Sequence, residues 1–221
     1  MIDPDSRLTQ LGLLPVCQLE RHYLFESRAY GGSSERTLAE LTAEWAAAIF
    51  GVAGARPYIA LARHHEPEGH IAVSLGVGEN RAKRLPDPFE EELLGLLGGT
   101  GAPIWIDQGA GGEEAARVER AIARSGVRVR RWDGSFAGFA GVIAASRMYV
   151  GYDSAGQHVA AAARVPLISI FAGFPTPRMF HRWKPEGAGA RVIRVDRPDP
   201  KATLEQVRQE LKDFVSERTA K

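Results

Sequence analysis

A short polar turn in the second half of the chain has the residue types of an anion-binding site. An apolar run, residues 148–152, ends at Asp153 and Ser154, and an Ala-rich helical stretch follows directly up to Ala163. The first N–H groups of a helix have no partner within it, and they attract anions. We expect Asp153 or Ser154 to cap this helix and Gly156 to let a ligand approach the backbone. A well-capped crossover helix without a ligand is the alternative interpretation.

A basic loop follows an earlier apolar run. It carries Arg81, Lys83 and Arg84, and cationic side chains at the carboxyl end of a strand can neutralise a diphosphate. The preceding Gly76-x-Gly78 lacks the third glycine of a dinucleotide fingerprint, so it does not indicate a dehydrogenase. An ordinary solvated basic loop is the alternative.

A third polar turn, residues 107–112, leads into a helical stretch that opens with Glu113 and Glu114. The helix dipole favours acidic residues in a first turn by a few tenths to about 1 kcal/mol. These two carboxylates therefore need no function to explain them.

The first turn and its flanks resemble the signature of glycosyltransferase family 9, the ADP-heptose:lipopolysaccharide heptosyltransferases and their relatives. The resemblance rests on Asp153-Ser154-Ala155-x-x-His158-x-Ala160-Ala161-Ala162 and on Val165-Pro166-Leu167-Ile168-Ser169-Ile170-Phe171. It implies the C-terminal half of a GT-B fold, in which two Rossmann-like halves face each other across a cleft. In that family the turn holds the diphosphate and the sugar of the donor.

The resemblance extends to the other two turns. Lys83, before Arg84-Leu85-Pro86, matches a lysine that the family places on the phosphates. Gly109-x-x-x-Glu113 matches the spacing of a glutamate that accepts from the ribose hydroxyls, with Glu114 as the alternative if the register shifts by one. The donor-binding residues implied in this way are Arg81, Lys83, Glu113, Asp153, Ser154, Ala155, Gly156 and His158.

Three features leave alternatives open. His158 points at the sugar phosphates from the start of its helix, or it is a satisfied, half-buried histidine. Residues 132–136 wall the base pocket, as the corresponding loop does in the family, or they cap and pack, with Phe136 and Phe139 expected in the core. The loop 172–185 departs from the family's Phe-Gly-Pro-Thr-x-Pro, because it begins Ala172-Gly173-Phe174-Pro175-Thr176 after Phe171.

Composition excludes several classes of protein. The 221 residues, 44% of them hydrophobic, suffice for a hydrophobic core. With 28 basic against 27 acidic residues, the chain has no overall charge that would attract nucleic acid or an anionic membrane. The single cysteine, Cys17, excludes an internal disulfide framework and fits a reducing compartment. No apolar run has the length of a membrane span, and the N-terminus lacks the pattern of a signal peptide. We expect a soluble cytoplasmic protein, with the inner face of the inner membrane as the alternative location.

From His70 onward, short β-type runs alternate with helical stretches, a pattern typical of a parallel sheet covered by helices. The expected strands are 71–75, 104–106, 127–130, 148–152, 167–171 and 192–195. The expected helices are 89–97, 113–125, 136–146 and 202–216, together with a turn and helix over 153–163. The fold class is therefore α/β, a Rossmann-like parallel sheet of about six strands with helices on both faces. A 3-2-1-4-5-6 strand order would place the ligand crevice beside the first and fourth strands.

The expected division of the chain is an irregular N-terminal segment plus a linker helix over 1–57 and a nucleotide-sugar-binding domain over 58–221. The helix covers 37–50, and a further short strand is expected at 58–61. Residues 1–57 are too few for a complete Rossmann-like half, so the chain is either a fragment of a longer enzyme or has a reduced N-terminal half. The glycan acceptor and the catalytic base are then expected outside this chain, on a facing domain or a second chain, and we expect the chain alone to bind nucleotide with at most slow donor hydrolysis.

The sequence thus predicts a heptosyltransferase-like glycosyltransferase of lipopolysaccharide biosynthesis. It would transfer a sugar from a nucleoside-diphosphate sugar to a lipopolysaccharide or other glycan acceptor without a metal or cofactor, since the carboxylates and histidines lack ligand spacing. A non-catalytic nucleotide-sugar-binding module and a GT-B-type epimerase are the alternatives. An epimerase would show a catalytic carboxylate or histidine set in both halves.

Overall fold

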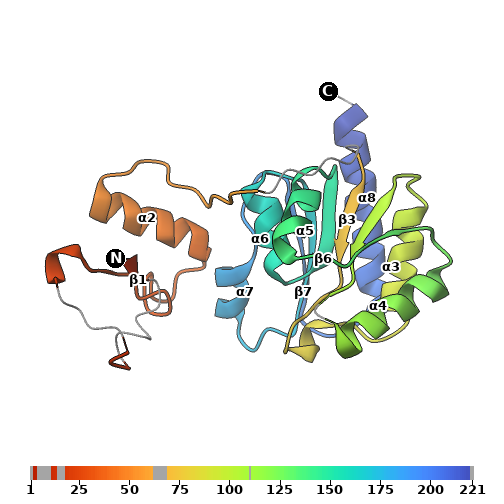
Figure 1. The fold of residues 1–221 in the computed structure, drawn as a ribbon, viewed down its shortest axis with the longest axis horizontal. Coiled ribbons are helices and arrows are strands. Elements are labelled where there is room, and N and C mark those ends of the chain that lie inside the picture. The colour runs from red at the N-terminus through yellow and green to blue at the C-terminus, as the bar shows by residue number, and fades with distance from the viewer. Residues whose placement is uncertain (1, 4–10, 14–17, 62–68, 110, 220–221) are drawn as a thin grey trace. The chain divides into compact units, whose positions relative to one another are not determined.

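The computed structural model describes residues 2–3, 11–13, 18–61, 69–109 and 111–219. The chain forms two compact units (Figure 1): Met1–Pro57 with Pro177–Trp183, and Tyr58–Thr176 with Lys184–Lys221. All three polar turns singled out in the sequence belong to the second unit.

The second unit is built on six parallel strands in the order β5-β4-β3-β6-β7-β8. Their bounds are β3 Ile71–Ser74, β4 Ile104–Asp107, β5 Arg130–Trp132, β6 Met148–Tyr152, β7 Leu167–Ala172 and β8 Ala190–Val195. Counted along this sheet, the order is 3-2-1-4-5-6, as the sequence predicted. The winding therefore reverses between β3 and β6.

Helices cover both faces of this sheet, which confirms the predicted fold class (Figure 1). They are α3 Phe89–Gly98, α4 Gly112–Ser125, α5 Phe136–Ala144, α6 Ala155–Ala162 and α8 Pro200–Thr219. The larger core cluster joins α3, α4 and α8 to one face, and the smaller joins α5 and α6 to the other. Successive residues of β3 alternate between them, because strand side chains point to opposite faces: Ile71 and Val73 enter the larger cluster, and Ala72 the smaller.

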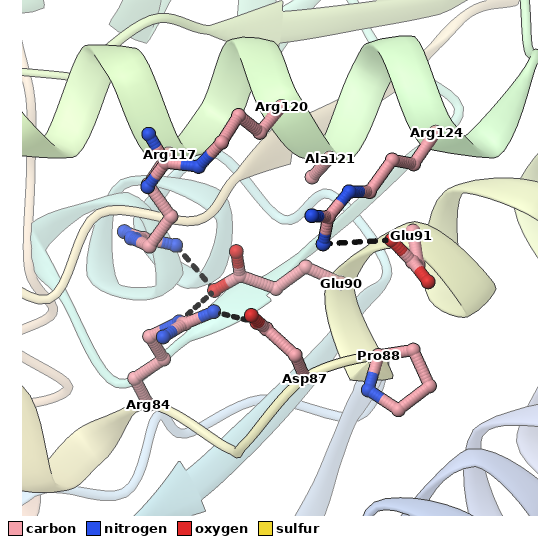
Figure 2. A pocket seen from close by; sticks show the side chains of 9 residues that line it. All are labelled: Arg84, Asp87, Pro88, Glu90, Glu91, Arg117, Arg120, Ala121 and Arg124. Atoms are coloured by element: carbon pink, nitrogen blue, oxygen red, sulfur yellow. Dashed lines mark hydrogen bonds and ion pairs between the residues drawn. The ribbon is translucent and has the colours of Figure 1, made fainter.

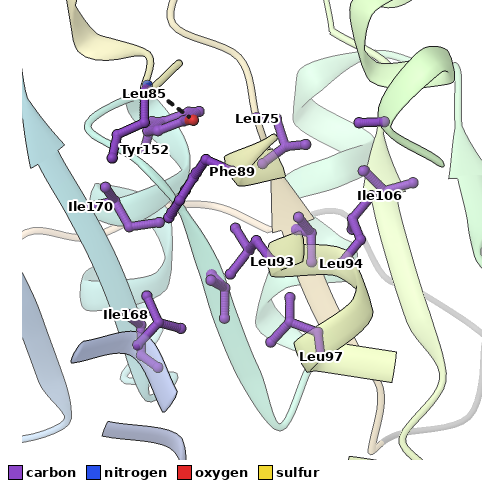
Figure 3. Packing of buried hydrophobic residues seen from close by; sticks show 14 of the residues in the cluster. Leu75, Leu85, Phe89, Leu93, Leu94, Leu97, Ile106, Tyr152, Ile168 and Ile170 are labelled. Carbon is purple, nitrogen blue, oxygen red and sulfur yellow. Dashed lines mark hydrogen bonds between the residues drawn. The ribbon is translucent and has the colours of Figure 1, made fainter. Parts of the chain in front are cut away.

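The larger core cluster is built from branched aliphatic side chains around two aromatic rings. Figure 3 shows Leu93, Leu94 and Leu97 of α3 turned toward the sheet, with Phe89 beside Tyr152. The Tyr152 hydroxyl accepts a hydrogen bond from the backbone N–H of Leu85 at 3.3 Å, so the chain after the basic loop is tied to β6. Every residue of β3, β6 and β7 is buried, as expected for central strands of a parallel sheet.

Three details of the sequence prediction are wrong. The third strand spans 130–132 rather than 127–130, because pairing with β4 begins at Arg130, while Val127 and Val129 pack against the core as partly buried side chains. Residues 58–61 form no strand, and Tyr58 is 87% exposed. Phe139 is buried as expected, but Phe136 is 47% exposed on the first turn of its helix.

The first unit centres on α2, Leu38–Phe50. Thr37 and Glu40 form a capping box at its start, and Gly51 ends it in the left-handed region at φ 67°. Leu41 and Trp45 are its buried residues, and the Trp45 ring lies 5.3 Å from Phe25 and 5.6 Å from Phe50. Short elements precede it: β1 Ile2–Asp3, paired in parallel with β2 Tyr23–Leu24, and the 3-10 helix η1 Leu19–Arg21.

The loop 172–185 contains a helix that the sequence prediction missed, α7 Pro177–Trp183, and this helix belongs to the first unit. Two arginines attach it there through backbone carbonyls. Arg178 donates to the carbonyls of Arg28 and Gly32, and the buried Arg182 to those of Tyr30 and Gly32. Their guanidinium groups therefore have a structural role within this unit.

Two glycine-to-alanine substitutions test the packing beneath α6. A Cβ on Gly156 would lie 2.3 Å from the Tyr149 hydroxyl oxygen, so we expect Gly156→Ala to destabilise the fold by about 1–3 kcal/mol. A Cβ on Gly95, inside α3, meets nothing within 4 Å, so Gly95→Ala should stabilise by about 0.5–1 kcal/mol. Urea unfolding of both variants measures this difference, and effects of the same sign would contradict the packing described.

Candidate functional site

The three polar turns meet at one edge of the sheet because the strands that precede them end level. Ser74 at the end of β3 pairs with Asp107 of β4 and with Gly151 of β6. In open α/β sheets, ligands bind at the carboxyl edge where the winding reverses. In this chain that point lies between β3 and β6.

Lys83 and Asp153 form a largely buried ion pair at this point. Lys83 ends the 3-10 helix η2, Arg81–Lys83, and its Nζ lies 2.8 Å from Asp153 Oδ2. The same ammonium donates to the Asp153 backbone carbonyl at 3.1 Å. The two side chains are 19% and 5% exposed. The basic loop and the turn after β6 are thus joined through two of the predicted site residues.

The expected side-chain cap of α6 is wrong. Ser154 occupies the N-cap position, but no side chain makes the capping hydrogen bond there. The Asp153 carboxylate instead binds Lys83 through Oδ2 and accepts a hydrogen bond at Oδ1 from the Nε2 of the buried Gln157. The first backbone N–H groups of α6 are therefore not capped by either predicted residue.

Tyr149 fills the space beneath the turn. Its hydroxyl oxygen lies 3.5 Å from Ser154 Oγ, and a Cβ added to Gly151 or Gly156 would lie less than 3 Å from it. Burial raises the pKa of the Tyr149 hydroxyl to about 12, so the group keeps its proton. This packing alone accounts for the glycine at 156, and the approach of a ligand there stays a prediction. Ala155 is exposed at the start of α6.

The two candidate glutamates differ in position. Glu113 is 83% exposed and forms an ion pair with the equally exposed Arg81, so the loop after β3 and the start of α4 meet at the surface. Glu114 points inward, and its Oε2 accepts from the backbone N–H of Val77 at 3.1 Å. Glu114 therefore braces the loop after β3, and the ribose contact of Glu113 stays a prediction.

Sequence reasoning assigned no site role to five polar residues of this edge: Ser74, Asp107, Tyr149, Gln157 and Ser169. Asp107 ends β4, where burial raises the pKa of its carboxyl, and a hydrogen bond from the Gly109 backbone N–H at 3.2 Å opposes that shift. The polar side chains at the ends of two apparently hydrophobic strands, Ser74 and Asp107, were the available signal.

His158 lies on the first turns of α6 with an exposed side chain, and its Nε2 is 3.3 Å from the Nε2 of Gln157. Although part of the ring reaches solvent, the surrounding protein bulk lowers its pKa below the ordinary value. Asp153 opposes this shift, and Lys83 reinforces it. The ring is therefore biased toward its neutral form. Because the folded state favours neutral His158, the unfolded state binds its proton more readily. The contribution of His158 to the free energy of unfolding therefore declines as the pH falls below about 6.5, the ordinary pKa of histidine.

Arg84 does not join Lys83. Figure 2 shows it on the wall of a small polar pocket between α3 and α4, where its guanidinium binds Asp87 and Glu90. Arg117 of α4 binds the same Glu90 carboxylate and donates to the Leu75 carbonyl at 2.7 Å. Carboxylates balance these arginines, so this network ties the two helices to the end of β3 and lies apart from the Lys83 pair.

The described residues hold no group of three or more histidine, cysteine, aspartate or glutamate side chains arranged to bind a metal ion. Among the helices of this part of the chain, none combines the length and apolarity needed to cross a membrane.

Comparisons with known proteins identify the family and the fold. The model of glycosyltransferase family 9 (heptosyltransferase) matches residues 62–212. The E. coli heptosyltransferase WaaC solved with ADP has a TM-score of 0.64 at 23% identity, over 82% of this chain and 57% of WaaC. WaaC solved with ADP-2-deoxy-2-fluoro heptose gives 0.64 at 20% identity, over 98% and 71%. The family 9 glycosyl transferase of Veillonella parvula DSM 2008 gives 0.60 at 12%, over 79% and 53%. A comparison with curated proteins found no match.

The second unit is therefore a Rossmann-like parallel sheet with a polar carboxyl edge, and the chain belongs to glycosyltransferase family 9. In the WaaC–ADP comparison it spans 57% of the relative's length. At identities of 23% or less, the solved structures establish the fold and not the donor or acceptor.

Nuclear magnetic resonance titration of His158 tests the electrostatics of the edge. We expect the pKa of His158 to lie below the ordinary value of about 6.5. Asp153→Asn should lower it further, because the carboxylate favours the imidazolium, and Lys83→Met should raise it, because the ammonium disfavours it. Lys212→Met, an exposed change on α8, is the control and should leave the titration unchanged. Shifts of the same sign in the two site variants would contradict the arrangement.

Proposed function

We propose that the second unit binds the nucleoside-diphosphate-sugar donor of a heptosyltransferase-like glycosyltransferase, which transfers the sugar to a lipopolysaccharide or other glycan acceptor. The donor's diphosphate binds between Lys83 and the start of α6, and Arg81, Glu113, Ser154, Ala155, Gly156 and His158 surround it. The observation that carries the proposal is the placement of the Lys83 ammonium on the turn that opens α6, at the reversal of the sheet.

The chemistry of this reaction requires positive charge where the nucleoside diphosphate departs. A lysine ammonium and the N-terminal dipole of a helix both supply it, and fixed groups of this kind stabilise developing charge without reorganisation. Lys83 is fixed on two sides, by the side chain and by the backbone of Asp153. We therefore propose that departure of the diphosphate needs no divalent metal.

The acceptor side of the reaction requires a base within hydrogen-bond reach of the attacking hydroxyl. At the carboxyl edge Lys83 and Asp153 are engaged with each other, and the surroundings of His158 lower its pKa below the ordinary value. We propose that the base and the acceptor site are supplied from outside the donor-binding sheet, by a facing domain or a second chain. The division of the chain into two units between Pro57 and Tyr58, with α7 in the first unit, is consistent with a donor-binding unit that is separate from the rest.

Binding measurements test the ligand class. We expect at least one of ADP, UDP and GDP to bind with the same affinity in the presence and absence of EDTA, because Lys83 and α6 supply the positive charge. Isothermal titration calorimetry measures this. Strict dependence on a divalent ion, or no binding of any of the three, would contradict the proposal. Transfer of a labelled sugar to a lipopolysaccharide-core acceptor then separates a transferase from a non-catalytic binding module.

Removal of the ammonium tests the role of Lys83. Lys83→Ala should weaken nucleoside diphosphate binding by roughly 1.5–3 kcal/mol, the scale of a hydrogen bond to a charged group. This corresponds to about a 10- to 150-fold rise in Kd. The double variant Lys83→Ala/Asp153→Asn avoids leaving a buried carboxylate unpaired and should bind as weakly. Lys212→Ala is the control for the loss of one surface charge. An equal loss of nucleoside diphosphate affinity in that variant would contradict the assignment of Lys83 to the phosphates.

A further inference from the structure

We propose that Gln157 is a positioning residue of the donor site: its amide holds the Asp153 carboxylate against the Lys83 ammonium and so fixes the cation that receives the phosphates. The assignment to donor binding rests on the proposed function above. The hydrogen bonds that carry it involve only residues of the second unit.

Three buried polar side chains form a chain of hydrogen bonds that ends at Lys83. Gln157 and Ser169 are completely buried, and Asp153 nearly so. Ser169 Oγ, on the central strand β7, donates to Gln157 Oε1, and Gln157 Nε2 donates to Asp153 Oδ1. The other carboxylate oxygen, Oδ2, lies 2.8 Å from Lys83 Nζ. The ammonium is thereby connected through hydrogen bonds to β7, a fully buried interior strand of the sheet.

The partners fix the orientation of the amide. If the amide were turned over, its oxygen would face the carboxylate of Asp153 and two acceptors would be in contact, which is unfavourable in a buried site. With the nitrogen toward Asp153, both amide ends are satisfied. Gln157 Nε2 also lies 3.3 Å from His158 Nε2, so the same amide adjoins a second candidate donor-binding side chain.

This arrangement has a functional consequence beyond helix stability. A carboxylate held by a single partner can rotate, and Lys83 follows it because a buried ammonium keeps its counter-charge. Held at both oxygens, the carboxylate presents one fixed position for Nζ. The Gln157 amide adjoins Asp153 and His158, and Lys83 binds the other oxygen of the Asp153 carboxylate, so a charge placed at residue 157 acts on all three.

The test uses two substitutions of similar size. Gln157→Met keeps the volume and removes the hydrogen bonds, and we expect about tenfold weaker ADP binding than wild type at both pH 8 and pH 5.5, the loss of about one hydrogen bond. Gln157→Glu should be at least as weak at pH 8, where the new carboxylate repels Asp153. At pH 5.5 it should approach wild type, because a protonated carboxyl donates to Asp153 as the amide does.

The chain offers a matched control on α8. Gln209 donates to Asp213 at 2.8 Å with the same four-residue spacing as Gln157 and Asp153, but on an exposed surface. Gln209→Met and Gln209→Glu should bind ADP as wild type does at both pH values. Each variant is compared with wild type at the same pH, since the nucleotide itself titrates in this range.

A second readout requires no ligand. The ammonium signal of Lys83 in nitrogen-15 NMR persists when the group is held by hydrogen bonds, and Lys83→Arg assigns it. We expect this signal to broaden in Gln157→Met and to remain in Gln209→Met. An unchanged signal together with unchanged ADP affinity would overturn the inference. If wild type binds no nucleoside diphosphate, the proposed function fails, and the ammonium signal alone decides whether Gln157 positions Lys83. Should Gln157→Met not fold, the pH 8 and pH 5.5 comparison of Gln157→Glu decides in its place.

Discussion

The reversal of winding between β3 and β6 decides where the polar turns of this chain meet. After β3 the chain passes to α3 on one face of the sheet, and after β6 it passes to α6 on the other. Loops that leave adjacent strands toward opposite faces diverge, and they leave space at the carboxyl edge. The level register of β3 and β6 then brings η2 and the turn at Asp153 within one side-chain length of each other.

The ion pair at this edge has an energetic cost that the surrounding groups must offset. Taking an ammonium and a carboxylate out of water costs several kcal/mol per ion unless their remaining lone pairs and protons find partners. Asp153 meets this requirement with bonds at both carboxylate oxygens. Lys83 has three donors, and the two bonds to Asp153 account for two of them among the described residues. One donor therefore remains for a phosphate oxygen without breaking the pair.

The sequence was sufficient for the features that depend on local pattern. Alternation of apolar and helical stretches predicted six parallel strands, and the three that are buried throughout, β3, β6 and β7, were the clearest apolar runs. It misplaced β5, since Val127 and Val129 pack on the core without pairing with β4. It also predicted a strand at 58–61, where the apolar residues pair with no strand. Helix α7 was missed because residues 172–185 were compared only with a loop motif of the family.

The site was predicted only in part. The resemblance to the family singled out Lys83 and Asp153, and the structure brings them together. It gave no reason to select Gln157 or Ser169, because their hydrogen bond joins residues of α6 and β7 twelve positions apart, and such contacts leave no periodic signal. It also could not assign the carboxylates of Glu113 and Glu114, since neighbouring residues on a first helical turn differ in direction by about 100°. The inward side chain of Glu114 is selected by the backbone N–H of Val77.

The two cations of the proposed phosphate site therefore have different freedom to move. Arg81 and Glu113 are both 83% exposed, and exposed pairs of this kind contribute about 0–1 kcal/mol, so Arg81 can exchange Glu113 for a phosphate at little cost. Lys83 is anchored through Asp153 and Gln157 to Ser169 on the buried strand β7. A fixed ammonium gives the reacting phosphates a defined position, while an exchangeable guanidinium can close over them after they bind. The rigid group belongs nearest the bond that breaks, since displacement there lowers the rate most.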